Sequence, residues 1–238
     1  MISLIGAPCD AGANRPGAAQ GPQALRAAGL LLLRSRGLDV RDRGDLTGPA
    51  HPGLPVAGGY RHLSEVVAWN TTVYEAVHSE LQRGHLPILL GGDHSLAIGS
   101  ISAVARHCRD GGKTLRILWL DAHADCNNRR TSPSGNLHGM PVACLCGFGP
   151  PTRTGLSGQT PAISPASLRQ IGIRSVDEGE VKFCMNMIAQ TGRLASLDVV
   201  ELNPSLDEHQ VTAEISVAMI RALLGSVHPS QGREMPSQ

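Results

Sequence analysis

Short apolar runs alternate with longer amphipathic segments along most of the chain, and this alternation strongly limits the possible folds. The short runs predict strands, and the longer segments carry apolar residues at helical spacing. The expected strands are Ile2–Ile5, Val40–Arg43, Pro87–Leu90, Leu115–Leu120, Gln170–Ile173 and Leu197–Leu202. The expected helices are Gln23–Arg36, His62–Gln82, Leu96–His107, Pro141–Cys146 and Ala213–Leu224. Strands that alternate with helices favour an α/β fold whose mostly parallel sheet is covered on both faces.

The length of the chain suits one domain. With 238 residues, of which 41% are hydrophobic, it can bury a sizeable core, but it is not obviously long enough for two. Two stretches rich in Gly and Pro, Asp45–Gly59 and Gly147–Ser167, are typical of surface loops within a domain. We therefore expect a single domain over residues 1–227 and a loose tail over residues 228–238.

Charge and composition argue against nucleic acid and membranes as partners. The net charge is +1, the basic residues are scattered, and aromatic residues make up only 3% of the chain. No apolar run approaches the length of a membrane span, and the first residues do not resemble a signal peptide. The six cysteines include no C-x-x-C pair, which favours reduced thiols. We expect a soluble, cytoplasmic protein.

Two of the expected strands end in clusters of metal-ligand residue types. Pro87–Leu90 leads into G-G-D-H-S, which contains His94, and the later strand leads into D-A-H-A-D, which contains Asp121, His123 and Asp125. In an extended chain, residues at i, i+2 and i+4 point to the same side. A single His or Asp after a strand usually caps or hydrogen-bonds, but this grouping is hard to bury without a cation. Two carboxylates and two imidazoles suit Mn²⁺ or a similar divalent ion.

A third polar cluster, S-G-N-L-H-G-M-P, follows at residues 134–141. Small polar residues of this kind are common in turns. Beside a metal site, however, they are also typical of a substrate rim, with His138 placed for proton transfer.

Together, G-G-D-H-S, D-A-H-A-D and S-G-N-x-H-G resemble the arginase family of ureohydrolases, from residue 2 to about residue 225. The S-G-N and the E-L-N-P at residues 201–204 resemble arginase more than agmatinase. The resemblance implies a three-layer α/β/α fold, two Mn²⁺ per chain, hydrolysis of L-arginine to L-ornithine and urea, and assembly as a homo-trimer or hexamer.

The resemblance also implies residue roles. The metal ligands would be His94, Asp121, His123 and Asp125, with Asp121 bridging two ions. His138 would carry a proton to the leaving amine, and Glu201 would hold the guanidinium. The groups that would hold the α-carboxylate and α-amino group of the substrate are Asn127, Ser134, Asn136 and Asp177. These roles fit the chemistry, because a protonated guanidinium is best held by a carboxylate.

One block of the family pattern is absent. Arginases carry S-x-D-x-D-x-x-D-P, whose first two aspartates complete the metal pair, and it is not found intact between Asp177 and Glu201. Residues 196–204 have the length of that block, with Asp198 at its first aspartate, but they fit the last strand of the family better. On either alignment at least one ligand is lost. We therefore expect a missing strand–helix segment, a doubtful second metal site and impaired catalysis.

Other functions stay open at this point. An agmatinase-like ureohydrolase is one alternative, although a substrate without a carboxylate would not need S-G-N and Asp177. A catalytically inactive relative that binds or regulates a partner is a second, and an unstable truncated product is a third.

Overall fold

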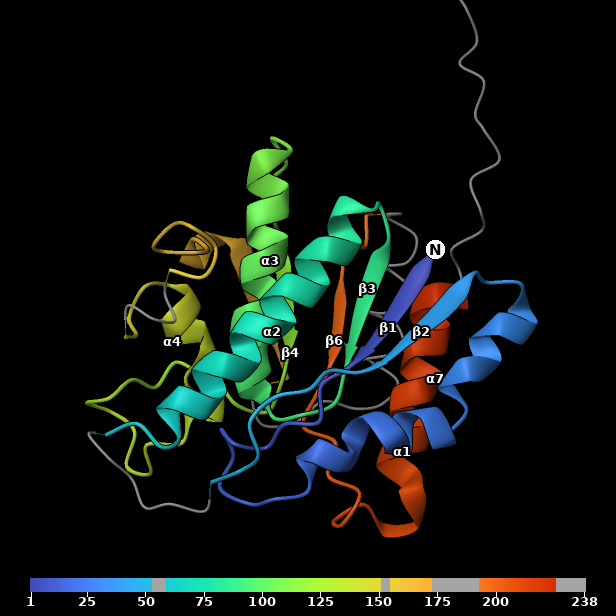
Figure 1. The fold of residues 1–238 in the computed structure, drawn as a ribbon, viewed down its shortest axis with the longest axis horizontal. Coiled ribbons are helices and arrows are strands. Elements are labelled where there is room, and N and C mark those ends of the chain that lie inside the picture. Colours follow the sequence, from blue (N-terminus) through green and yellow to red (C-terminus); the bar gives the residue numbers. More distant parts are fainter. Residues whose placement is uncertain (53–58, 151–154, 173–192, 226–238) are drawn as a thin grey trace, which may run out of the picture.

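All strand pairs in the described residues are parallel. The computed structural model describes residues 1–52, 59–150, 155–172 and 193–225 (Figure 1). One sheet has the order β2 (Val40–Asp45), β1 (Ile2–Gly6), β3 (Leu86–Leu90) and β6 (Leu197–Val199). A second, two-stranded sheet pairs β4 (Ile117–Leu120) with β5 (Leu168–Ile171). The parallel arrangement brings the carboxyl ends of β1, β3 and β6 to the same edge.

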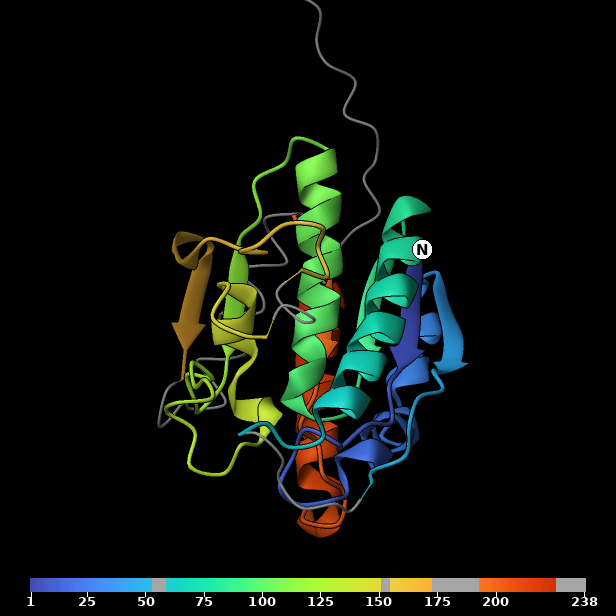
Figure 2. The ribbon, with the colours of Figure 1, turned by 60° about the vertical axis from the view of Figure 1, so that its left-hand side comes forward.

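Helices cover both faces of the larger sheet, so the fold has three layers (Figures 1 and 2). The α-helices are α1 (Gly21–Ala27), α2 (Leu63–Gln82), α3 (Ala97–Asp110), α4 (Pro141–Leu145) and α7 (Val211–Gly225). The 3-10 turns are η1 (Ala18–Gln20), η2 (Leu30–Arg36), η3 (His94–Leu96), η4 (Leu137–Gly139), η5 (Pro165–Ser167) and η6 (Glu208–Gln210). None of these helices is long and apolar enough to span a membrane.

The core follows the two-residue period of the central strands. Ile5 and Leu89 lie in one cluster with the apolar side of α2, including Val73. Leu4 and Ile88 lie in the other, which includes residues of α1 and α7. Because successive side chains of a strand point to opposite faces, β1 and β3 supply both cores.

The two sheets meet through side chains. Among the described residues, no ladder joins β6 to β4, and Figure 2 shows β4 and β5 on one side of α3 with β3, β1 and β2 on the other. Leu120 of β4 instead packs in a small apolar cluster with Leu197 of β6 and Leu223 of α7. All three residues of β6 are half-buried, whereas β1 is buried throughout. The edge of β6 away from β3 therefore forms no strand pair in the described part of the chain.

Most element boundaries differ from the sequence predictions by a few residues, and three of the differences bear on the fold. The single helix predicted over Gln23–Arg36 is wrong, because Gly29 has φ 90° and separates α1 from η2. The strand predicted over Leu197–Leu202 ends at Val199, since Glu201 has a left-handed φ of 63°. The strand predicted over Gln170–Ile173 begins earlier, at Leu168, and residue 173 lies outside the described residues, as does the predicted tail.

A buried carboxylate ties the amino-terminal end of the sheet to α2. The side chain of Glu80, 6% exposed, accepts hydrogen bonds from Ser3 of β1 and from Arg43 of β2, the latter at 2.8 Å. Arg83 and His85 also contact it, each at 2.8 Å. Burial alone would raise the pKa of Glu80, but the hydrogen bonds from Ser3, His85 and Arg43 outweigh it and lower the pKa to about 2.

We expect Glu80→Gln to lower the free energy of unfolding by about 3 kcal/mol at pH 7, because it removes the buried charge that Arg43 and Arg83 pair with. Urea denaturation measures this. The folded pKa of about 2 lies below the ordinary 4.5, so the stabilisation is complete above about pH 4.5 and is lost as the pH falls towards 2. Glu75→Gln, at an exposed position of the same helix, is the matched control. Equal stability of the two variants at pH 7 would contradict the expectation.

Candidate metal centre

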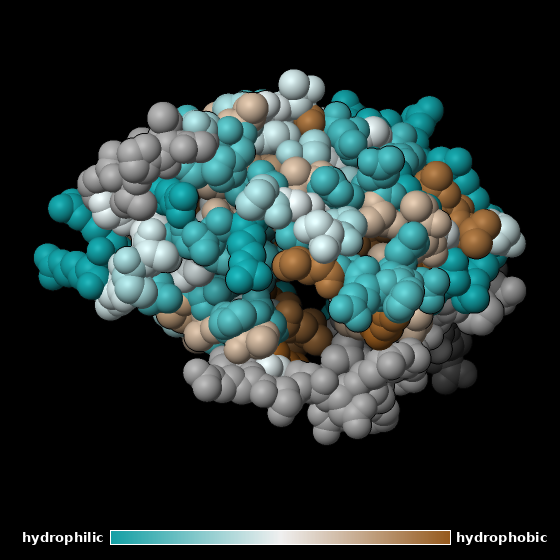
Figure 3. All heavy atoms as spheres, turned by 90° about the horizontal axis from the view of Figure 1, so that it is seen from below, coloured by the Kyte–Doolittle hydropathy of each residue, from teal (hydrophilic) through white to brown (hydrophobic). Residues whose placement is uncertain are grey.

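The turn after β3 is built to present His94. Asp93 caps η3, since its buried carboxylate accepts the backbone N–H of Ser95 at 2.9 Å and of Gly12 at 2.8 Å. Gly92 has φ 76°, and a Cβ at this position would lie 2.6 Å from the carbonyl oxygen of Ala7. These constraints place His94 at the carboxyl edge of the sheet, the face seen in Figure 3, which is largely hydrophilic and hollowed beside hydrophobic residues.

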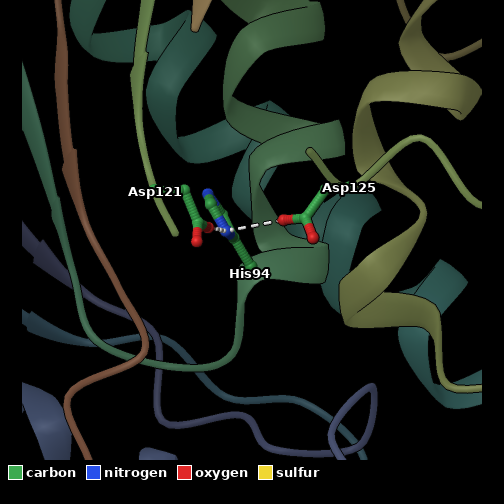
Figure 4. A group of neighbouring side chains, drawn as sticks. All are labelled: His94, Asp121 and Asp125. Atoms are coloured by element: carbon green, nitrogen blue, oxygen red, sulfur yellow. Dashed lines mark ion pairs between the residues drawn. The ribbon is translucent and has the colours of Figure 1, made fainter. Parts of the chain in front are cut away.

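Three side chains converge at this edge (Figure 4). The Nδ1 atom of His94 lies 2.7 Å from Oδ2 of Asp121 and 2.9 Å from Oδ2 of Asp125. One ligand atom from each residue lies within 4.8 Å of the others. The His94 ring stacks on Trp119, with ring centroids 4.2 Å apart, which fixes the ring plane. One imidazole and two carboxylates at such distances can hold a divalent cation.

The electrostatics of the cluster favour a positive charge at its centre. Burial would lower the pKa of His94, but the hydrogen bonds with Asp121 and Asp125 raise it to about 9. Burial would likewise raise the pKa of Asp121, but hydrogen bonds from His94 and from the backbone of His123 lower it. In the metal-free protein, a proton on His94 therefore occupies the position where a cation would balance the two carboxylates.

The backbone after β4 is kinked where the sequence predicts an extended chain. The strand ends at Leu120, Asp125 has φ 48°, and the carbonyl of Asp125 accepts the backbone N–H of Val142 in α4 at 3.1 Å. The kink turns Asp125 towards His94. The close group of ligand atoms contains Asp121 and Asp125 but not His123.

His123 lies at the solvent-exposed side of the cluster, beside Asp121. Its side chain is 82% exposed, and its Nδ1 atom lies 3.3 Å from Oδ1 of Asp121, the oxygen opposite the one that contacts His94. Of the four predicted metal ligands, the structure thus brings three together and leaves His123 at the solvent side.

An acid–base pair lies beside the cluster of His94, Asp121 and Asp125. The Nδ1 atom of His138 lies 3.1 Å from Oε1 of Glu201, and this oxygen also accepts the backbone N–H of His94 at 2.7 Å. The hydrogen bond with Glu201 raises the pKa of His138. Burial would raise the pKa of Glu201, but the hydrogen bonds from His138 and the His94 backbone lower it. Both predicted catalytic residues thus sit next to the cluster as an ion pair.

The predicted substrate-binding residues are placed less uniformly. Asn127 and Ser134 are exposed, and the Ser134 hydroxyl accepts the backbone N–H of Asn136 at 3.3 Å. Asn136 is buried, and its Oδ1 atom has no hydrogen-bond partner among the described residues. Asp177 lies outside the described residues.

Two supporting residues escaped the sequence analysis. Trp119 stacks on His94, and Asp93 holds the turn that presents it. Asp93 is the third residue of G-G-D-H-S and precedes a short helix, as capping residues do, whereas Trp119 lies two positions before Asp121. The position of Asp93 before the short helix could therefore have predicted its capping role. The stacking of Trp119 on His94 could not have been predicted, because it follows no sequence pattern.

The fold and this cluster define a parallel α/β protein with a histidine–carboxylate cluster, able to hold a metal ion, at the carboxyl edge of its sheet. Comparison with known proteins gives the family. The sequence model of the Arginase family matches residues 1–187 and 179–225. The chain belongs to the arginase family, whose members are ureohydrolases.

Individual relatives agree with this assignment. An arginase of Bacillus caldovelox is 33% identical over 296 residues, covering 94% of this chain and 98% of that protein. An arginase of Brevibacillus brevis is 37% identical over 210 residues, covering 87% of this chain and 68% of that protein. The solved Bacillus caldovelox arginase superimposes with a TM-score of 0.86 at 32% identity, covering 94% of this chain and 98% of that one. A Bacillus subtilis arginase gives 0.87 at 28%, with the same coverages.

We expect Glu201→Gln to lower the pKa of His138, because the variant removes the negative charge that favours imidazolium while keeping an oxygen acceptor. An NMR titration of the imidazole resonances in the metal-free protein measures the change. Glu208→Gln, at an exposed position seven residues further on, is the control and should leave the His138 pKa in place. An unchanged pKa in Glu201→Gln would show that the ion pair does not form in solution.

Proposed function

We propose that this chain hydrolyses L-arginine to L-ornithine and urea with a divalent cation, Mn²⁺, at the His94–Asp121–Asp125 cluster, and that its rate is strongly reduced. Membership of the arginase family supports the reaction. The observation that carries the proposal is the position of Glu201. Its Oε1 atom contacts Nδ1 of His138 and also accepts the backbone N–H of His94, the proposed metal ligand.

The chain's own groups suit the two ends of the reacting guanidinium. Glu201 offers a carboxylate that is 40% exposed and so accessible to a ligand, and a planar cation pairs well with such a group. The protonated imidazole of His138, 3.1 Å from that carboxylate, is placed to give its proton to the leaving amine. A bound divalent cation supplies activated water as the nucleophile at neutral pH.

The polar rim supports an amino-acid substrate over agmatine. Neutral amide and hydroxyl groups from Asn127, Ser134 and Asn136 can hold a carboxylate without burying an unpaired charge. The buried Oδ1 atom of Asn136 has no hydrogen-bond partner among the described residues and can accept a hydrogen bond from a buried water. Asp177 is proposed to hold the α-amino group. Agmatine has no carboxylate for this rim.

Three observations support a missing segment, which is why we propose a reduced rate. The family model matches in two overlapping stretches, 1–187 and 179–225. The alignment with the Bacillus caldovelox arginase spans 296 positions, whereas this chain has 238 residues, so at least 58 positions have no counterpart here. In the described residues the sheet is also divided between β6 and β4. A lost central strand would take with it any ligands at its carboxyl end.

A regulatory role is the second candidate, because β6 leaves an edge without a strand partner among the described residues. An inactive relative could bind an intact family member there. Coexpression with such a member and pull-down tests this role, and no association would rule it out. From the sequence we also propose a cytoplasmic location. We further propose a homo-trimer or hexamer, and light scattering after gel filtration would measure the mass of that assembly.

We expect the Mn²⁺-loaded protein to release urea slowly from L-arginine and not from agmatine. His138→Asn should lower the rate about 10²- to 10⁴-fold, the usual contribution of a general acid. His107→Asn, in the last turn of α3, is the control and should retain the rate. Urea from agmatine alone would instead make the protein an agmatinase. No urea from either substrate would contradict the proposed reaction and favour the regulatory role.

A further inference from the structure

We infer that this chain binds one divalent cation and not two, and that His94, Asp121 and Asp125 hold it, with Asp121 binding through Oδ2. This deepens the proposed function, because it specifies the metal centre at which that reaction would take place. The family resemblance implies a dinuclear centre, so the question is whether the residues present fit a pair of ions. The residues that the structure describes fit one ion on the His94 side of Asp121 and do not fit a second on the other side.

The first position has three protein ligands, His94, Asp121 and Asp125. Its three ligand atoms lie within 4.8 Å of one another and come from the ends of β3 and β4. The side chains of His94, Asp121 and Asp125 are 13%, 16% and 7% exposed, so the cradle is shielded but open enough for water to complete the coordination. The stack on Trp119 and the cap at Asp93 hold the imidazole in place.

Among the described residues, the second position has only two candidate protein ligands. It would lie against Oδ1 of Asp121 and the imidazole of His123, which is 82% exposed. Within residues 1–52, 59–150, 155–172 and 193–225, no other group of three His, Cys, Asp or Glu side chains brings ligand atoms together. An exposed pair of ligands leaves most of the coordination to water, and a divalent ion held in that way dissociates readily.

Nearby carboxylates do not complete the second position. Asp198 of β6 accepts a hydrogen bond from Ser100 of α3, which holds it against that helix. Oε1 of Glu201 is occupied by His138 and the backbone of His94. Neither residue belongs to the group of close ligand atoms.

Charge balance points the same way. The two ionised aspartates, Asp121 and Asp125, neutralise one dication. A second dication would add two positive charges while the exposed His123 contributes none, so the half-buried site would carry an uncompensated charge. The pair of ions is therefore disfavoured by charge as well as by ligand count.

This inference makes His123 dispensable for metal binding, whereas a dinuclear centre would require it. Mn²⁺ alone is titrated into the full-length protein by calorimetry, and bound metal is counted after gel filtration. The electron paramagnetic resonance spectrum then distinguishes an isolated Mn²⁺ from a spin-coupled pair. We expect one ion per chain, an uncoupled spectrum, and the same stoichiometry with an affinity within about twofold in His123→Ala, since an exposed side chain contributes little.

The matched variants are Asp125→Asn and Asp121→Asn, which should weaken Mn²⁺ binding by at least about 10-fold, as expected on losing a direct ligand. Circular dichroism melts establish that each variant folds; should one fail to fold, the other carries the comparison. Two ions per chain, a coupled spectrum, no binding, or loss of an ion in His123→Ala would each overturn the inference.

The Mn²⁺ titration contains no substrate, so the number of bound ions is measured independently of the urea assay. One bound ion without urea release would contradict the proposed reaction and leave the one-ion inference standing.

Discussion

Two carboxylates held against one imidazole at the edge of a parallel sheet form the interaction on which the rest of this site depends. Asp121 and Asp125 both contact Nδ1 of His94, and a positive charge between them is needed to offset their repulsion. The sheet supplies this arrangement, since the turn after β3 presents His94 and the turn after β4 presents the aspartates. The backbone kink at Asp125 then closes the cluster.

Glu201 depends on a single neighbouring strand. β6 pairs only with β3 among the described residues, and this ladder continues through the backbone bonds from Gly91 to Val199, at 2.6 Å, and from Glu201 to Gly92, at 2.8 Å. β3 therefore positions both His94, the proposed metal ligand that follows it, and the carboxylate proposed to hold the guanidinium. These two groups can keep their relative positions in a divided sheet because both are held by β3. The hydrogen bond from Ser100 to Asp198 also holds β6 to α3.

The sequence predicted the parts of this structure that depend on local pattern. The strands before G-G-D-H-S and D-A-H-A-D were recognisable because buried apolar runs end in polar residues. The split of α1 from η2 at Gly29 and the orientation of His123 were not, because both depend on individual backbone angles. The kink at Asp125 is stabilised by Val142, seventeen positions away, and no spacing rule within D-A-H-A-D contains that contact. The pairing of β6 with β3 could not be predicted either, since the apolar pattern of residues 197–199 does not specify which strand is its neighbour.

The two oxygens of Asp121 face different parts of the molecule, and this explains how one half of a metal centre can persist without the other. Oδ2 faces His94, which β3 and the Asp93 cap hold, whereas Oδ1 faces the exposed His123. A segment lost from the Oδ1 side would remove ligands there without disturbing the supports of His94. The contacts of His94 with Asp121 and Asp125, and the His138–Glu201 pair, do not involve the His123 imidazole, so they can be retained if the second ion is lost. The chain can then keep the fold and cluster of its family without full catalytic power, because the retained and lost parts of the site would contact different oxygens of Asp121.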